Sequence, residues 1–159
     1  MGTILRHAEV DVVVDAPASA VWEIAGDPRR TGEWSHECLQ VEFVDEAAAP
    51  ALGVRFRGRN EVGKRGWSRT CEIVSFDPGR EISWRTVPTG IYRDSMIWTI
   101  TVVPEGDGTR IAERYQVVKL GPVFDRFIYQ FVPVHRDRRE ALTADLQRIG
   151  EVAAALNAT

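Results

Sequence analysis

Residues 121–156 read GPVFDRFIYQFVPVHRDRREALTADLQRIGEVAAAL, and this stretch decides the fold that the rest of the chain can adopt. In its second half the apolar residues recur every three or four positions: Leu142, Leu146, Ile149, Ala153 and Leu156. This spacing predicts a long C-terminal helix with one apolar stripe. Helix propensity alone does not hold such a helix in water, so the stripe requires a flat apolar partner.

The first half of the same stretch carries a second apolar face. Its members again have helical spacing: Val123, Phe124, Phe127, Ile128, Phe131 and Val132. Pro133 predicts a kink or break after them, because proline removes a backbone donor and clashes with the preceding turn. We expect residues 142–156 to clamp the sheet and residues 123–131 to form a wall or gate of a cavity.

Upstream, apolar and polar residues alternate in short runs separated by Gly, Pro and Asp. Such runs predict antiparallel strands, here at residues 9–15, 37–43, 53–62, 67–76, 81–87, 94–103 and 110–118. Two short helices are expected between the first two strands, one after Pro17 and one over residues 29–34. The prediction is an α+β fold with a sheet of six or seven strands. Such a sheet curls, so a helix across its mouth encloses a space.

Strand alternation also predicts which side chains face that space. The predicted inward residues are Asn60, Trp67, Arg69, Cys71, Ile82, Trp84, Thr86, Met96, Trp98, Ile100, Ile111, Glu113 and Tyr115. In the second strand Leu39, Val41 and Phe43 are expected to face one way. Arg69 and Glu113 would be costly to bury alone, so we expect them to pair or to share a water. Such a pair can be purely structural or can bind a ligand, and the sequence leaves both open.

The candidate ligand-binding residues are aromatic and polar residues expected on the inward faces, with three phenylalanines as the lid. They are Trp34, Asn60, Arg69, Trp84, Trp98, Glu113, Tyr115, Phe124, Phe127 and Phe131. Trp22 and Trp67 are interpreted as core packing. The candidate catalytic residues are Glu113, Arg69, His36 and Tyr115, although the alternative for His36 is a solvated loop histidine.

Cys38 and Cys71 lack CxxC spacing and are interpreted as two buried, reduced thiols. The three histidines do not cluster in the sequence, so no metal site is expected. No cofactor is expected either, because the chain has no GxGxxG, HExxH or GxSxG motif.

The composition is that of an ordinary globular chain of 159 residues, 44% hydrophobic and 27% charged, and we expect one domain spanning residues 1–159. A net charge of -3 gives no general attraction to nucleic acid, and the basic run at residues 55–65 has no interleaved outward aromatics. No apolar run is long enough for a signal peptide or a membrane span. We therefore expect a cytoplasmic monomer or weak homodimer without nucleic-acid partners or stable membrane association.

Several stretches resemble one known family. They are VVVDAPASAVWEIAGDPRRTGEW at residues 12–34, GVRFRGRN at 53–60, GWSRTCEIVSFDPGREISWR at 66–85, WTITVVPEGDGTRIAERY at 98–115, and the arginine-rich final helix. Together they resemble the polyketide cyclase/dehydrase branch of the START-like (SRPBCC) superfamily, over nearly the whole chain. The resemblance implies a helix-grip fold, in which a curved antiparallel sheet wraps a long C-terminal helix around a hydrophobic cavity.

Members of this superfamily include aromatase/cyclases, lipid and sterol carriers and plant hormone receptors, so three functions stay open. The first is binding of a hydrophobic, aromatic or lipid-like small molecule. The second is a cofactor-independent cyclase or dehydratase, in which Glu113 or His36 moves protons and Arg69 or Tyr115 stabilises an enolate-like oxygen. The third is a co-chaperone-like protein-interaction domain that uses an exposed patch at residues 124–132.

Overall fold

The computed structural model describes residues 5–121 and 135–159. The elements are strand β1 (His7–Val14), helix α1 (Ala18–Ala25), 3-10 helix η1 (Pro28–Glu33), strands β2 (Cys38–Phe43), β3 (Arg55–Val62), β4 (Arg65–Asp77), β5 (Glu81–Thr86), β6 (Ser95–Glu105) and β7 (Gly108–Lys119), and helix α3 (Arg139–Asn157). The predicted helical segment at residues 123–132, with its lid residues Phe124, Phe127 and Phe131, and the kink at Pro133 lie outside the described residues.

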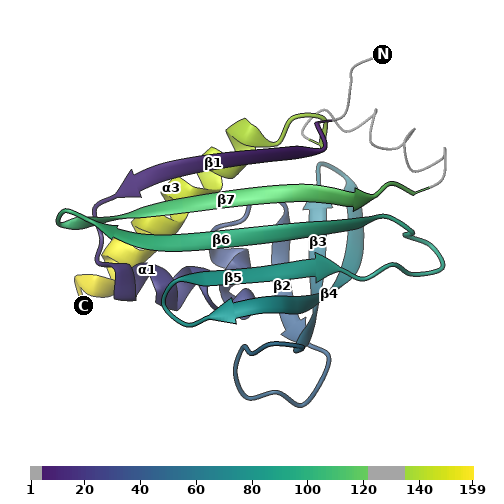
Figure 1. Ribbon diagram of the computed structural model, residues 1–159, viewed down its shortest axis with the longest axis horizontal. Coiled ribbons are helices and arrows are strands. Elements are labelled where there is room, and N and C mark those ends of the chain that lie inside the picture. Colours follow the sequence, from purple (N-terminus) through teal and green to yellow (C-terminus); the bar gives the residue numbers. More distant parts are fainter. Residues whose placement is uncertain (1–4, 122–134) are drawn as a thin grey trace.

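The sheet is a seven-stranded antiparallel meander in which β1 joins the far side of β7, in the order β1-β7-β6-β5-β4-β3-β2. Short turns join most neighbouring strands. The β3–β4 and β6–β7 hairpins turn through Gly63 and Gly106, whose φ angles of 62° and 58° suit glycine best. In Figure 1, β2 and β3 pass behind β5 and β6, so the sheet curls around α3. The predicted α+β helix-grip fold is confirmed.

Helix α3 packs its apolar stripe into the curl of the sheet, as its spacing predicts. Leu146 and Ile149 are completely buried in the main core, and α3 contacts both β1 and α1. Gly150 brings the helix especially close to the sheet: a Cβ atom built there would lie 2.4 Å from Cγ1 of Val14. The C-terminal helix is therefore seated on β1 through a contact that leaves no room for a side chain.

The orientation of β2 differs from the prediction. Leu39 is 48% exposed, whereas Cys38 and Val41 are buried. The pairing of β2 with β3 shifts register between Cys38 and Gln40, and such a bulge reverses the alternation at that point. The prediction that Leu39, Val41 and Phe43 share one face of the strand is therefore wrong at Leu39.

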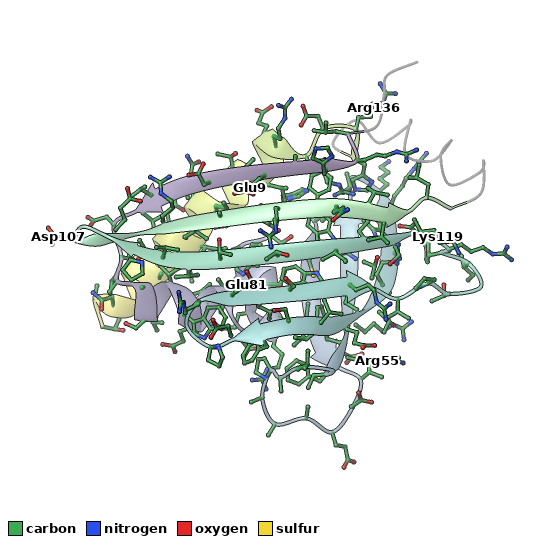
Figure 2. All side chains as sticks on the ribbon, viewed as in Figure 1. Glu9, Arg55, Glu81, Asp107, Lys119 and Arg136 are labelled. Atoms are coloured by element: carbon green, nitrogen blue, oxygen red, sulfur yellow. The ribbon has the colours of Figure 1, made fainter. Side chains whose placement is uncertain are left out.

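The outer face of the sheet is charged, as the alternation in β3 predicts. Arg55, Arg57 and Arg59 are exposed, while Phe56 and Gly58 between them are buried. Figure 2 shows further charged side chains at the ends of the strands, including Asp107 and Lys119. Among the described residues, no helix combines the length and the apolar character that a membrane crossing needs.

Candidate functional site

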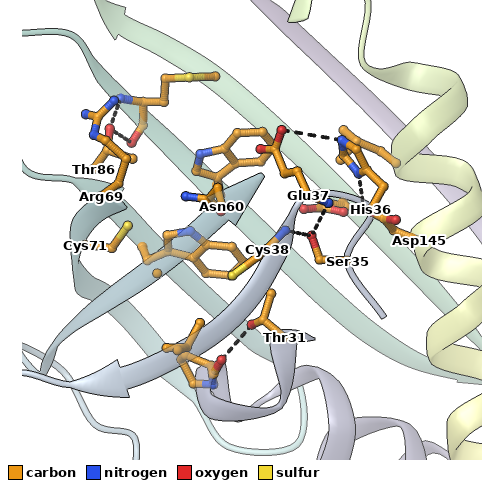
Figure 3. A pocket seen from close by; sticks show the side chains of 18 of the residues that line it. Thr31, Ser35, His36, Glu37, Cys38, Asn60, Arg69, Cys71, Thr86 and Asp145 are labelled. Atoms are coloured by element: carbon orange, nitrogen blue, oxygen red, sulfur yellow. Dashed lines mark hydrogen bonds and ion pairs between the residues drawn. The ribbon is translucent and has the colours of Figure 1, made fainter. Parts of the chain in front are cut away.

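A cavity of about 150 Å³ lies between the sheet, η1 and the start of α3. Every strand from β2 to β7 contributes to its wall, and Figure 3 shows it from close by. The lining residues are Ala25, Pro28, Thr31, Trp34, Ser35, His36, Glu37, Cys38, Val41, Phe56, Gly58, Asn60, Trp67, Arg69, Cys71, Trp84, Thr86, Met96, Trp98, Glu113, His135, Arg138, Leu142 and Asp145.

Most of the predicted inward side chains line this cavity because strand alternation turns them to the concave face. Asn60 on β3 pairs with Trp67 on β4, and Trp84 on β5 pairs with Trp98 on β6. Gly58 contributes no side chain: a Cβ there would lie 3.5 Å from Sγ of Cys38, in ordinary contact. The glycine thus leaves a space that a larger residue could fill.

Four tryptophans form much of the wall: Trp34, Trp67, Trp84 and Trp98. Trp67 lies edge-on to His135 with ring centroids 5.6 Å apart, so its interpretation as simple core packing is wrong. Trp22, by contrast, packs against Phe76 and does not line the cavity. Aromatic walls of this kind suit flat apolar molecules.

Arg69 is fixed in place by the loop between β5 and β6. Its Nη1 donates to both carboxylate oxygens of Asp94 at 3.0 Å, and its Nη2 donates to the Asp94 carbonyl oxygen at 3.2 Å. Its guanidinium also stacks over Tyr92, 5.1 Å from the ring centroid. The predicted pairing of Arg69 with Glu113 is therefore wrong, because Asp94 supplies the carboxylate from a loop that strand alternation does not describe.

A polar cluster lies on the other side of the cavity (Figure 3), around the carboxylate of Glu37. His135 Nε2 is 2.9 Å from Glu37 Oε2, and Arg138 Nη1 donates to Glu37 Oε1 at 3.4 Å. Burial opposes ionisation of Glu37, but these partners outweigh it and lower its pKa to about 2. Glu37 is therefore a buried carboxylate that is charged at neutral pH.

His36 belongs to the same cluster and is bonded to α3. Its Nδ1 lies 2.7 Å from Oδ2 of Asp145, and its side chain is only 23% exposed. Burial opposes the charge on His36, yet the hydrogen bond that its ring donates to Asp145 raises the pKa of His36 above the usual value. Burial also opposes the charge on Asp145 and therefore raises its pKa, while His36 opposes that rise. The interpretation of His36 as a solvated loop histidine is wrong.

Glu113 on β7 has a different environment. It is 3% exposed, and its Oε2 has no hydrogen-bond partner within the described part of the chain. Burial, followed by the nearby charge of Asp145, raises its pKa to about 8, and Arg138 opposes the rise. Glu113 is therefore an uncharged carboxylic acid at neutral pH.

Two further buried polar atoms share this lack of a partner, Nε1 of Trp34 and Nε of Arg69. Both side chains line the cavity, as Glu113 does. Buried polar groups are almost always hydrogen-bonded in folded proteins, and each exception calls for an explanation. The cavity thus combines aromatic walls with three polar atoms to which no described residue is bonded.

Tyr115 is not among the residues that line the described cavity. Its hydroxyl donates to the carbonyl oxygen of Leu5 at 3.1 Å, and its ring lies against Trp98 with centroids 5.3 Å apart. It therefore supports the wall from behind, and its predicted contact with a ligand lacks structural support.

The cysteines are free and buried, as the sequence predicts. Burial raises the pKa of the Cys38 thiol to about 11 and that of Cys71 to about 12, so neither is a reactive thiolate at neutral pH. Within residues 5–121 and 135–159, no group of three or more His, Cys, Asp or Glu side chains is arranged to hold a metal ion.

Sequence reasoning missed several polar residues of the site: Glu37, Asp94, His135, Arg138 and Asp145. Asp145 and Arg138 are both only 4% exposed. A signal for Asp145 was present, because it lies three residues after Leu142 and four before Ile149, on the buried stripe. The other contacts join residues far apart in the chain and have no local signature.

A curved antiparallel sheet with a C-terminal helix packed into its curl defines the helix-grip fold. The family model described as "Polyketide cyclase / dehydrase and lipid transport" matches residues 6–150. The chain belongs to this family, which confirms the resemblance seen in the sequence. None of the curated protein sequences compared with the chain matches it.

Solved structures with the same fold cover nearly the full length of the chain. A Thermus thermophilus protein has a TM-score of 0.67 at 19% identity, covering 94% of this chain and 98% of its own. A Nitrosomonas europaea protein has a TM-score of 0.68 at 14% identity, covering 96% and 97%. The Zhui aromatase/cyclase from a Streptomyces species has a TM-score of 0.64 at 23% identity, covering 95% of both chains. At these identities the likeness shows the shared fold alone.

Proposed function

We propose that this protein binds a small, largely apolar ring compound in the cavity between the sheet and α3. One observation carries the proposal: the residues that line a cavity with four tryptophans in its wall also carry buried polar atoms that no described residue satisfies. A packed core would leave neither space nor unpaired polar groups. Apolar walls with a few convergent polar groups are the usual design of a small-molecule site.

The size of the cavity sets the scale of the ligand. A volume of about 150 Å³ is close to that of an engineered apolar cavity that binds benzene. Sites for drug-sized molecules begin at roughly 300 Å³. The described cavity therefore suits a single ring, either as a whole molecule or as one end of a larger one.

The test is a binding titration with two single-ring compounds, ethylbenzene and acetophenone. Calorimetry measures the affinity of the protein for each compound. The variant Gly58→Val fills the cavity, since its new methyl groups extend from a strand position that faces the space. Gly66→Val is the matched control, because it makes the same change at an exposed position of the neighbouring strand β4. Valine favours strands, so both variants should fold.

Wild type and Gly66→Val should bind at least one of the two compounds, and Gly58→Val should bind it at least tenfold more weakly. Equal affinity in all three proteins would place the ligand outside the cavity. Absence of binding to the wild type, with no small molecule retained after native purification and mass spectrometry, would refute the proposal.

A second candidate function is proton-transfer catalysis in the same cavity. The observation in its favour is that Glu113, whose pKa is raised to about 8, lines the same cavity as Arg69, a potential partner for a developing negative charge. The ionised fraction of Glu113 would accept a proton from the methyl group of acetophenone and, after exchange with D₂O, return a deuteron to the same carbon, which NMR detects as deuterium exchange. Exchange should then be lost in Glu113→Gln and slowed in Arg69→Met; a rate equal to that without protein would exclude this activity.

The third function considered from the sequence, a protein-interaction domain, depends on the patch at residues 124–132. That patch lies outside the described residues, so this function stays a prediction.

A further inference from the structure

We propose that Glu113 donates a hydrogen bond from its uncharged carboxyl group to an oxygen atom of the ligand, and thereby selects neutral ring compounds with a carbonyl oxygen over hydrocarbons and amines. The proposal rests on the proposed function, because it names the class of ring compound that the same cavity takes. Glu113 would then be the residue that determines specificity.

The position of Glu113 in the cavity wall favours contact with a ligand. Glu113 is 3% exposed on strand β7, which lies between β1 and β6, and it lines the cavity. Its Oε2 is buried and has no partner among the described residues. A polar atom buried without a partner destabilises the protein, so its presence in a cavity wall favours a partner supplied by a ligand.

Charged groups on the neighbouring elements act on Glu113. Asp145 on α3 and Glu37 before β2 are carboxyl groups, and both disfavour a negative charge on Glu113. Arg138 favours that charge, but it also donates to Glu37 and stacks over Trp98 at 5.3 Å.

The histidines of the cluster already have acidic partners. His36 is bonded to Asp145, and His135 is bonded to Glu37. Burial has the largest effect on Glu113, and together with the two carboxyl groups it raises the pKa of Glu113 to about 8. The carboxyl group therefore keeps its proton at neutral pH.

The groups without a described partner also agree in the direction of their hydrogen bonds. A protonated carboxyl group in an apolar site can donate its O–H, as buried acids in some enzymes do. The other two unpartnered atoms, Nε1 of Trp34 and Nε of Arg69, can only donate. All three groups that lack a partner among the described residues are therefore donors at neutral pH. They match a ligand oxygen that accepts, whereas a hydrocarbon leaves them unpaired and an ammonium group cannot accept.

The experiment compares three ligands of nearly the same size, ethylbenzene, acetophenone and 1-phenylethylammonium, at pH 6.5. The proteins are wild type, Glu113→Gln, which keeps a neutral donor, and Glu113→Met, which removes it. Glu61→Gln on the exposed side of β3 is the matched control. Thermal unfolding establishes that each variant is folded before the titrations.

In the wild type, acetophenone should bind at least tenfold more tightly than ethylbenzene, and 1-phenylethylammonium should bind most weakly. Glu113→Gln and Glu61→Gln should keep this order. Glu113→Met should lose the preference for acetophenone while still binding ethylbenzene.

A pH series gives a second readout that does not depend on the methionine variant. Above a pH of about 8, the affinity of wild type for acetophenone should fall by up to about tenfold per pH unit, since binding then requires uptake of one proton. The affinity of Glu113→Gln should stay constant over the same range.

Equal binding of ethylbenzene and acetophenone by the wild type would overturn the assignment of Glu113 while leaving the proposed function in place. The same holds if Glu113→Met keeps the preference, if the ammonium compound binds most tightly, or if the wild-type affinity does not change with pH. Failure of all three ligands to bind the wild type, with no small molecule retained after native purification, would overturn both proposals together.

Discussion

At the scale of single residues, the site holds two buried carboxyl groups in opposite states. Glu37 has a hydrogen bond from His135 and the charge of Arg138, and its pKa falls to about 2. Glu113 has no such bond, and its pKa rises to about 8. The difference comes from the partners, because burial opposes ionisation of both groups.

Replacing Glu37 with alanine should be strongly destabilising. The change leaves His135 and Arg138, with side chains 10% and 5% exposed, without their carboxylate. Removing one partner of a buried ion pair typically costs about 3–5 kcal/mol. Urea denaturation measures the free energy of unfolding, and Glu42→Ala on the exposed side of β2 is the control. A loss for Glu37→Ala no larger than that of the control would show that the cluster contributes no stability.

Glu113 should make the fold less stable as the pH rises. Its pKa is raised from 4.5 to about 8 on folding, so between these values the native state binds a proton that the unfolded state has released. The free energy of unfolding of wild type should therefore fall across this window, relative to that of Glu113→Gln. Urea denaturation of both proteins at pH 5, 6, 7 and 8 measures the difference, and a constant difference would contradict the raised pKa.

Residue-level prediction from the sequence succeeded where a strand determines the direction of a side chain. Alternation placed Asn60, Arg69 and Glu113 on the concave face, where the structure has them. It could not identify Asp94 as the partner of Arg69, because Asp94 lies in a loop 25 positions away. Hydrogen-bond partners depend on which loops and helices meet, and alternation carries no information about that.

At the scale of secondary structure elements, the contact between α3 and β1 depends on Gly150. Gly150→Ala should destabilise the protein, although alanine favours a helix by about 1 kcal/mol, because the new methyl group overlaps both Cβ and Cγ1 of Val14. Overpacking of this kind costs about 1–3 kcal/mol. The melting temperature should fall, while Gly90→Ala, which meets no atom within 4 Å, should leave it nearly unchanged. An increase for Gly150→Ala would show that α3 can move away from the sheet.

The bond between His36 and Asp145 joins the η1–β2 connection to α3. Asp145→Asn should lower the pKa of His36 below its wild-type value, because burial remains while the negative partner is lost. NMR titration of the imidazole resonances in both proteins measures this change. An unchanged pKa at His36 would mean that Asp145 does not hold the ring in solution.

Element positions were predictable because each strand and helix carries its own period. The apolar stripe of α3 and the turns at Gly63 and Gly106 are local features, and the structure has them where the sequence indicates. The bulge in β2 was not predictable, since a register shift depends on pairing with β3. That single shift explains why Leu39 is exposed although its alternation indicates burial.

At the scale of the whole molecule, the fold follows from a meander that curls and a helix that needs an apolar partner. The cavity is the space that remains between them, and its polar contacts arise only after folding. Glu37 and Arg138, for instance, are 101 positions apart in the chain. The fold was therefore open to prediction from sequence, whereas the polar side of the cavity was not.

The most direct test of a ligand cavity is a crystal structure of the protein with acetophenone. We predict that the ring of acetophenone lies among Trp34, Trp84 and Trp98. Its carbonyl oxygen should lie about 2.5–3.0 Å from the carboxyl group of Glu113. A cavity filled by side chains, with acetophenone bound elsewhere or absent at concentrations that saturate binding in solution, would contradict the account.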